Sequence, residues 1–343
     1  MFWKYLMNLI TNDVAIDLGT ANTLVYVKGH GIVVNEPSVV ALETETKRII
    51  AIGEKAKEML GKTPREIKAI KPMKDGVIAD FEITEAMLRD LILRSQQKKF
   101  LVHPRVIVAV PSGITEVEKR AVKDSAVNAG ARKVFLVSEP LAAAIGVNLP
   151  VHEPYGNMII DIGGGTTEIA IVSLSHIVDH RSIRIGGDEM DEAIVSFLRK
   201  KHNLYIGEST AEKMKMKIGS AYPMKDELKM EVRGRDLISG FPVSIKISSQ
   251  EIREALSETI SEIVNAIKRL FEETPPELSA DIADRGVVLT GGAAQLKGLG
   301  QKIRETIDLP VTLVENPLTA VVMGSGKILD NLEEYKKVLI PNI

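Results

Sequence analysis

The sequence predicts an α/β protein built from two duplicated α/β domains, each with a smaller inserted subdomain, and a ligand in the cleft between the domains. Three observations support this prediction: a glycine-rich turn between two apolar runs, a second copy of that turn earlier in the chain, and a longer strand-helix-strand pattern that also occurs twice. A chain of 343 residues is long enough for about two domains of ordinary size.

The glycine-rich turn lies within residues 158–172, M-I-I-D-I-G-G-G-T-T-E-I-A-I-V. The apolar, β-branched runs on either side predict two paired strands. Gly163, Gly164 and Gly165 let the backbone approach an anion closely and present N–H groups to it. Asp161 ends the first strand, where a carboxylate has the charge and reach to hold Mg²⁺ through water. Taken alone, the motif fits a loose hairpin equally well, because short motifs also occur by chance.

Two other phosphate-binding motifs are not supported. Glu168 takes the position of the third glycine in the dinucleotide-binding fingerprint, and no helix pattern follows directly. The Gly-Lys-Thr at 61–63 does not form a P-loop, because Ala56 occupies the position of the first glycine.

The turn has an earlier counterpart at residues 14–27, V-A-I-D-L-G-T-A-N-T-L-V-Y-V, in which Asp17 aligns with Asp161 and Gly19 with Gly163. A second pattern, a strand, a small-residue turn, a helix, a strand and a Pro-Leu helix start, runs over 106–146 and again over 287–324. Two matches in the same order indicate an internal duplication with the ligand between the halves.

Composition narrows the function classes. The 44 basic and 46 acidic residues nearly cancel, so bulk charge does not indicate a nucleic-acid partner. The absence of cysteine excludes disulfides, thiolate metal sites and a cysteine nucleophile. Hydrolase-elbow and zinc-protease motifs do not occur either.

Residues 1–10 form an apolar segment at the start of the chain. As a helix it groups large side chains on one face, namely Phe2, Leu6, Leu9 and Ile10, with Trp3 at the edge. It is too short to span a bilayer, and we interpret it as a helix lying in the membrane interface. The alternative is a helix docked on its own domain.

The stretch K-K-F-L-V-H-P at 98–104 places Phe100 and Leu101 beside two lysines. This loop either dips into an anionic membrane next to residues 1–10, or its apolar side chains cap the core of the preceding helix, expected over 84–97.

Glu139 is the candidate catalytic residue. It stands between a strand end and Pro140 at a helix start, where its carboxylate can point into an interdomain cleft and orient a water for attack on a phosphate. An ordinary acid near a helix N-terminus is the alternative. The equivalent position in the second half is Asn316, so only one half keeps the acid. Thr166 and Thr167 supply hydroxyls beside the phosphate turn.

Two insertions interrupt the duplicated pattern. We expect a first domain of 1–31, 73–146 and about 327–343 with an insertion at 32–72, and a second domain of 147–181 and 258–326 with an insertion at 182–257. In the second insertion Gly187 and Asp188 open a helix. Glu212 and Lys215 share a helix face that either meets the ribose and base or carries a solvated ion pair.

Together these stretches resemble the nucleotide-binding motifs of the actin superfamily of ATPases, which also includes heat-shock chaperone ATPase domains and sugar kinases. The matching segments are two phosphate loops, two connecting helices and an adenosine motif: 17–23, 161–167, 139–146, 317–324 and 289–292. Within the superfamily the chain is similar to the MreB family of bacterial actin homologues over nearly its whole length, in segments such as N-E-P-S-V-V-A-L and T-P-P-E-L-S-A-D-I-A-D-R-G.

The resemblance implies an actin-like ATPase fold and a slow ATPase that uses Mg²⁺. It also implies a cytoplasmic protein that assembles with copies of itself into filaments on the inner face of the cytoplasmic membrane. There it would act with cell-wall synthesis and shape proteins to organise wall synthesis and rod cell shape.

The resemblance also implies roles for individual residues. Catalysis would involve Glu139, Thr167 and Asp161, and Mg²⁺ would be held through water by Asp17 and Asp161. Nucleotide contacts would come from Asp17, Gly19, Thr20, Ala21, Asn22, Gly163, Gly164, Gly165, Thr166, Gly187, Asp188, Glu212, Lys215, Gly291 and Gly292. The chain departs from the pattern at Ala293, where a third glycine is frequent. It also has Asn22 and no nearby lysine in the first phosphate loop, so charge on the phosphates would depend more on Mg²⁺ and backbone amides.

Three other function classes share this fold. A chaperone would need a substrate-binding domain after the ATPase core, and a small-molecule kinase would need a specificity pocket, for which the sequence gives no sign. A nucleotide-binding module that does not hydrolyse ATP would have the same sequence features and would differ only in its rate of hydrolysis.

Overall fold

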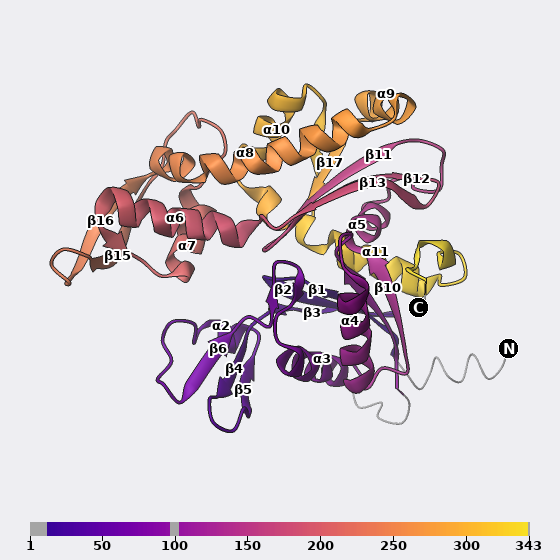
Figure 1. The fold of residues 1–343 in the computed structure, drawn as a ribbon, viewed down its shortest axis with the longest axis horizontal. Helices are drawn as coiled ribbons and strands as arrows, with labels where there is room; N and C mark the ends of the chain where they lie inside the picture. The colour runs from indigo at the N-terminus through magenta and orange to yellow at the C-terminus, as the bar shows by residue number, and fades with distance from the viewer. Residues whose placement is uncertain (1–11, 97–102, 342–343) are drawn as a thin grey trace.

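The computed structural model describes residues 12–96 and 103–341 (Figure 1). The predicted membrane contacts Phe2, Trp3, Leu6, Leu9, Ile10, Phe100 and Leu101 lie outside these residues. Within the described parts of the chain, no helix combines the length and the apolar character needed to cross a bilayer.

Two five-stranded sheets have the same strand order. The first runs β3-β2-β1-β9-β10 and the second β13-β12-β11-β17-β18. In each, the first three strands are antiparallel neighbours, and the last two join in parallel. The bounds are β1 (Val14–Leu18), β2 (Asn22–Val27), β3 (Gly31–Pro37), β9 (Arg105–Val110), β10 (Lys133–Ser138), β11 (Asn157–Ile162), β12 (Thr167–Ser173), β13 (His176–Ile183), β17 (Val287–Thr290) and β18 (Val311–Leu313).

The matching order confirms the duplicated pattern predicted from the sequence. Even the irregularity is repeated, because the register shifts between Val25 and Tyr26 in the first half and between Ile171 and Val172 in the second. One assignment was wrong: β3 had been placed in the first insertion, but it is hydrogen-bonded to β2 within the main sheet, as β13 is to β12. The remaining boundaries of the four parts stay predictions.

Each half carries smaller elements that project to one side (left in Figure 1). In the first half these are β4 (Val40–Glu43), β5 (Ile49–Ile52), α2 (Glu54–Lys57) and β6 (Ile67–Ile70), followed by the hairpin β7 (Met73–Lys74) and β8 (Val77–Ile78). In the second half they are α6 (Gly187–His202), β14 (Leu204–Tyr205), α7 (Glu208–Ile218), β15 (Lys229–Asp236) and β16 (Pro242–Ser248).

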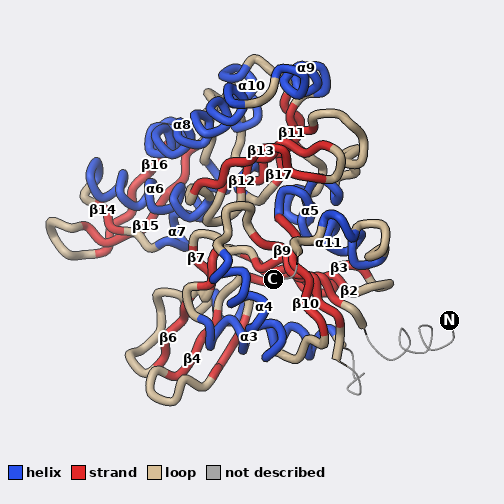
Figure 2. Tube along the Cα trace, turned by 45° about the vertical axis from the view of Figure 1, so that its right-hand side comes forward, coloured by secondary structure: helices blue, strands red, loops and turns tan. Residues whose placement is uncertain are grey.

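Helices cover the sheets on both sides (Figure 2). Their bounds are α3 (Phe81–Ser95), α4 (Glu116–Asn128), α5 (Glu139–Gly146), α8 (Ser249–Glu273), α9 (Pro276–Arg285), α10 (Leu299–Ile307) and α11 (Ala320–Asp330), with short 3₁₀ turns η1 (Ala293–Gln295), η2 (Pro317–Thr319) and η3 (Lys336–Val338). Helix α3 starts earlier than the expected residue 84 because Asp80 caps it, accepting a hydrogen bond from the N–H of Ile83.

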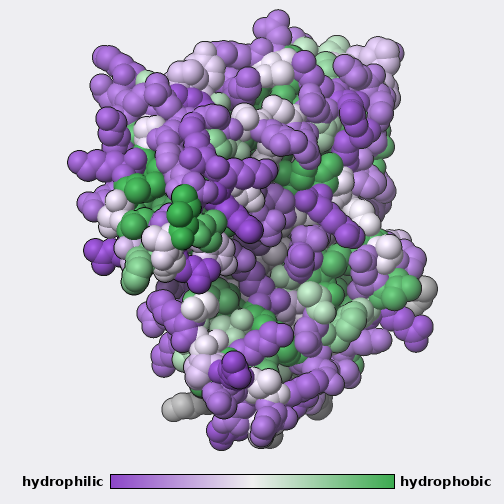
Figure 3. Space-filling view, turned by 60° about the vertical axis from the view of Figure 1, so that its left-hand side comes forward, coloured by the Kyte–Doolittle hydropathy of each residue, from purple (hydrophilic) through white to green (hydrophobic). Residues whose placement is uncertain are grey.

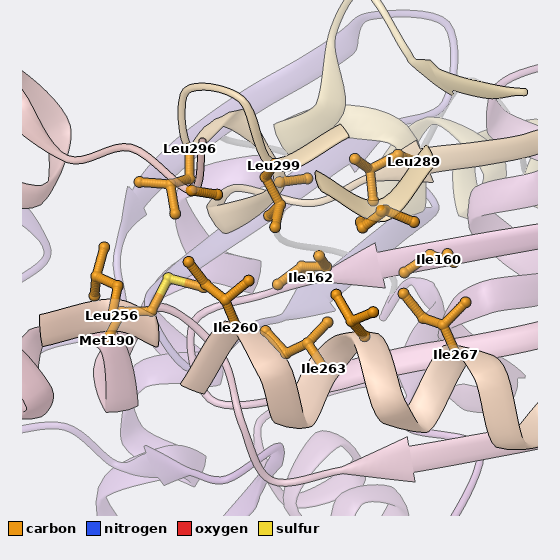
Figure 4. Close-up of a cluster of buried hydrophobic side chains, with 14 of the residues drawn as sticks. Ile160, Ile162, Met190, Leu256, Ile260, Ile263, Ile267, Leu289, Leu296 and Leu299 are labelled. Atoms are coloured by element: carbon orange, nitrogen blue, oxygen red, sulfur yellow. The ribbon is translucent and has the colours of Figure 1, made fainter. Parts of the chain in front are cut away.

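The second half has its core between α8 and the second sheet (Figure 4). Buried side chains recur along α8 at helical spacing, as at Leu256, Ile260, Ile263 and Ile267. They face Ile160 and Ile162 of β11, whose strand is buried along its whole length. Burial of large aliphatic side chains is the main stabilising contribution in such a layer.

Helices α5 and α11 pack between the two sheets and connect the halves. Their cluster includes Ala15 and Ile107 from the first sheet and Ile159 and Ala170 from the second. The two helices cross closely, since a Cβ added to Gly324 would lie 1.7 Å from the carbonyl oxygen of Ala142. The cleft between the halves is therefore closed at this level by packed helix backbones.

Candidate functional site

A cavity lies between the two halves. Most predicted site residues line it, namely Asp17, Gly19, Thr20, Ala21, Asn22, Glu139, Asp161, Gly163, Gly164, Thr166, Gly291 and Gly292. Six predicted site residues do not line the cavity: Gly165, Thr167, Gly187, Asp188, Glu212 and Lys215. Several of them contact the loops that do line it.

The two predicted phosphate loops contact each other across the cleft. A Cβ added to Gly164 would lie 2.7 Å from the Cβ of Ala21, and one added to Gly165 would lie 2.9 Å from the hydroxyl oxygen of Thr20. Only glycine allows this approach, and the sequence repeat had predicted that the two loops face a common ligand.

Hydrogen bonds from residues outside the first phosphate loop hold its backbone in place. The hydroxyl of Ser38 donates to the carbonyl oxygen of Gly19 at 2.6 Å and lies 2.8 Å from the hydroxyl of Thr23. The N–H of Gly76, in the β7–β8 turn, donates to the hydroxyl of Thr20. The backbone of this loop is thus preorganised by residues outside it.

The second loop is held by the start of helix α6. The N–H of Gly187 donates to the carbonyl oxygen of Gly163 at 3.0 Å, and the N–H of Asp188 donates to that of Gly164 at 2.7 Å. Thr167 is fully buried, and its hydroxyl donates to the carbonyl oxygen of Ile185 at 2.7 Å. Thr167 therefore anchors the start of β12, while Thr166 lines the cavity.

Acidic side chains converge on the cavity from both halves. Asp17 lies on β1, Asp161 on β11 and Glu139 at the start of α5. Burial raises the pKa of Asp17 to about 7, and burial together with the charges of Asp17 and Glu168 raises the pKa of Asp161 to about 8. Glu139 also has a pKa well above its usual value, through burial and then the charges of Glu168, Asp17 and Asp161.

Glu139 borders a second, smaller cavity as well. Its lining is mainly apolar and includes Val110, Ile114 and Val122. An apolar wall on one side of the carboxyl contributes to the raised pKa of Glu139, because burial disfavours the charged form.

Glu168 is a site residue that the sequence interpretation missed. It lies opposite Asp161 in the β11–β12 pair, lines the cavity and is 1% exposed. Its carboxylate accepts hydrogen bonds from the N–H of Ser112 and the hydroxyl of Ser182. The sequence feature that could have identified Glu168 is an acidic residue within a mainly apolar strand.

The donor set fits Mg²⁺ held partly through water. Among the described residues, no group of three or more acidic or histidine side chains is arranged to bind a metal ion directly. Mg²⁺ commonly takes one or two carboxylates and fills its remaining positions with water and phosphate oxygens. Asp17, whose pKa is raised by burial, and Asp161, whose pKa is raised by burial and nearby negative charge, are carboxylates of that kind.

Glu212 and Lys215 do not pair with each other. Glu212 bonds to Lys57 of the first half at 2.8 Å, and Lys215 bonds to Asp191 at 2.9 Å and to the carbonyl oxygen of Gly187 at 2.6 Å. Lys215 is therefore directed towards the base of the second phosphate loop.

Comparison with known proteins gives one consistent family. A family model described as MreB/Mbl protein matches residues 11–337. The cell shape-determining protein MreB of Escherichia coli (strain K12) is 51% identical over 337 residues, covering 97% of each chain. The cell shape-determining protein Mbl of Bacillus subtilis (strain 168) is 47% identical, covering 96% of this chain and 99% of that protein.

A solved structure agrees with these sequence matches. The crystal structure of MreB5 of Spiroplasma citri bound to ADP superposes with a TM-score of 0.91 at 38% identity, covering 95% of this chain and 98% of that one.

Proposed function

The chain belongs to the MreB/Mbl family and has an actin-like fold, and from this premise we propose that it binds ATP with Mg²⁺ in the cleft, hydrolyses it slowly and polymerises into filaments. The filaments would lie on the inner face of the cytoplasmic membrane and, with cell-wall synthesis and shape proteins, organise wall synthesis and rod cell shape. The observation that carries the proposal is the cavity in which the two predicted phosphate loops meet beside three acids that line it.

The backbones of the two loops would bind the phosphates. Backbone N–H groups of residues 20–22 and 163–166 line or adjoin the cavity and can be directed at anionic oxygens. Gly291 and Gly292 would let the nucleoside approach the backbone closely. Gly291 also lies against the second sheet, where a Cβ would collide with Asp161 and Ile162. Glu212, Lys215 and Gly187 would contact the nucleoside from the second insertion.

Glu139 would orient the water that attacks the terminal phosphate and accept its proton. In its ionised form, a carboxyl with a raised pKa is a stronger base than an ordinary glutamate. Asp17 and Asp161 would hold the shell of Mg²⁺, which supplies positive charge to the phosphates when bound. Thr167 would hold the second phosphate loop in position relative to Glu139 through its hydrogen bond to the carbonyl oxygen of Ile185.

Glu139→Gln tests the catalytic role. Phosphate release should fall by about 100-fold or more, because general-base assistance contributes that much, while ATP affinity changes only a few-fold. Glu116→Gln, on the exposed surface of α4, is the matched control and should release phosphate at the normal rate. Normal turnover in Glu139→Gln would remove the catalytic assignment.

Pelleting tests assembly and membrane binding. The purified protein is spun with ATP, with ADP and without nucleotide, each with and without anionic liposomes, while phosphate release is followed. ATP-dependent pelleting that increases with liposomes, and that loses the increase on deletion of residues 1–10, supports the proposal. A monodisperse particle that binds ATP tightly throughout would contradict polymerisation and favour another use of the fold.

A further inference from the structure

Two ion pairs join the small inserted parts of the two halves. The ammonium of Lys71, just after β6, lies 3.0 Å from the carboxylate of Asp188 and 3.8 Å from that of Glu208. Lys57 of α2 lies 2.8 Å from Glu212 of α7. Figures 1 and 2 both place α7 opposite the elements that carry these lysines. The halves are thus connected by charge on this side as well as through α5 and α11.

The Lys71–Asp188 pair is partly shielded from water. The side chain of Lys71 is 31% exposed and that of Asp188 is 26% exposed. Burial acts to lower the pKa of Lys71, but the negative charges of Asp188, Glu208 and Asp191 outweigh it and the pKa is raised. Lys71 therefore stays charged at neutral pH. A pair in this environment is screened less by salt than a fully exposed one.

Asp188 has a second contact through its backbone. Its N–H donates to the carbonyl oxygen of Gly164, and the N–H of the preceding Gly187 donates to that of Gly163. Gly163 and Gly164 line the cavity between the halves. Asp188 therefore has two contacts: its carboxylate pairs with Lys71 of the first half, and its backbone N–H holds the second phosphate loop.

We propose that Lys71 is a positioning residue for the second phosphate loop: from the opposite half it holds Asp188, and through Asp188 it fixes the loop and slows the release of bound nucleotide. The inference deepens the proposed function by adding a residue outside the cavity and the step that it controls. It predicts that loss of the Lys71 charge loosens the loop even when no nucleotide is present.

Hydrogen exchange tests the link to the loop without relying on nucleotide binding. Lys71→Glu brings a carboxylate against Asp188 and Glu208, and the amides of residues 186–189 should then exchange about 5–10-fold faster in nucleotide-free protein. Lys68→Glu, an exposed lysine on β6, is the control and should leave these amides unchanged. Equal protection in Lys71→Glu and Lys68→Glu would overturn the inference.

Release of a fluorescent ATP analogue tests the functional consequence. The analogue should leave Lys71→Glu about 5–10-fold faster than the unaltered protein, and the reversed pair Lys71→Glu with Asp188→Lys should restore most of the difference. Unchanged release from Lys71→Glu would overturn the inference while leaving the proposed function intact. Failure of the unaltered protein to bind the analogue would instead remove the proposed function.

Discussion

Asp17, Glu139 and Asp161 are held in the folded protein in surroundings that favour their neutral forms. The unfolded chain would lose these protons near pH 4, the ordinary range for carboxyls, whereas the folded protein keeps those of Asp17 and Asp161 until about pH 7 and 8. Groups with a raised folded pKa stabilise the fold fully at low pH and lose that contribution as the pH rises through the folded value.

The stability of the protein without nucleotide and Mg²⁺ should therefore fall between about pH 5 and pH 8. Asp161→Asn removes a carboxyl whose pKa is raised to about 8, so at pH 8 it should raise the free energy of unfolding by on the order of 2–4 kcal/mol and flatten the pH dependence. Urea unfolding at several pH values measures this. Asp124→Asn, an exposed position on α4, is the control. If the stability of Asp161→Asn depends on pH as strongly as that of the original protein, the raised pKa of Asp161 does not affect folding.

At the scale of single residues, the sequence indicated which residues line the cavity where a residue's position follows from its own segment. Asp17 and Asp161 stand at strand ends before the two predicted phosphate loops, Glu139 stands at a helix start, and all three line the cavity. Glu168 was missed because an acid in an apolar strand gives no sign of the neighbouring element. The partners of Asp188 and Glu212, Lys71 and Lys57, lie more than 100 residues away in the chain and depend on how the halves pack.

Among the elements, α5 and α11 have the closest backbone contact. Gly146 and Gly324 lie at their crossing, where an added Cβ would approach the carbonyl oxygens of Ala320 and Ala142 to 1.9 Å and 1.7 Å. No rotamer change relieves a clash with backbone, so any side chain here must separate the helices. The distance between the two halves is thus set by the absence of two side chains.

Gly324→Ala should lower the free energy of unfolding by about 1–3 kcal/mol, as overpacking does in well-packed cores. Because the helices connect the halves, ATP affinity should fall as well. Gly300→Ala, within α10, has only ordinary contacts at 3.9 Å and should be neutral or slightly stabilising. Urea unfolding compares the two variants. If Gly324→Ala is as stable as Gly300→Ala, the crossing is not tight in solution.

The order of the elements was largely readable from the sequence because the pattern occurs twice. The two hairpins, the later parallel strands and the Pro-Leu helix starts are all found where the repeat put them. The third strand of each sheet was harder to assign. In β13, partly buried positions alternate with exposed ones over the first part of the strand. Strand β3 also mixes exposed, partly buried and buried positions. An edge strand buries less apolar surface than a central one, so its pattern is weaker.

The whole molecule contains separate cores rather than one. One cluster fills the second half, another the first, and a third surrounds α5 and α11 between them. Large apolar side chains also remain on the surface, including Ile238 and Phe241 at the β15–β16 turn, 81% and 73% exposed. Figure 3, which brings that side of the molecule forward, shows such apolar areas among mainly polar surface.

Separate cores predict that the two halves unfold in overlapping but distinct calorimetric transitions in the absence of ligand. ATP and Mg²⁺ in the cleft contact both halves, so they should merge the transitions and add about 2.7 kcal/mol at a ligand concentration 100 times the Kd. Gly164→Val, whose side chain would collide with Ala21 where the loops meet, should lose the shift. A single transition at every ligand concentration would contradict independent halves.

The shared strand order has a consequence for the direction in which a ligand can lie. Two identical halves facing each other across a cavity would accept an elongated molecule in either of two opposite senses, with equal energy. This chain removes that ambiguity at equivalent helix starts, with a carboxyl at Glu139 and an amide at Asn316. Of these two equivalent positions only the first carries an acid, so a molecule with a charged tail and a flat head meets different surroundings in its two senses of entry.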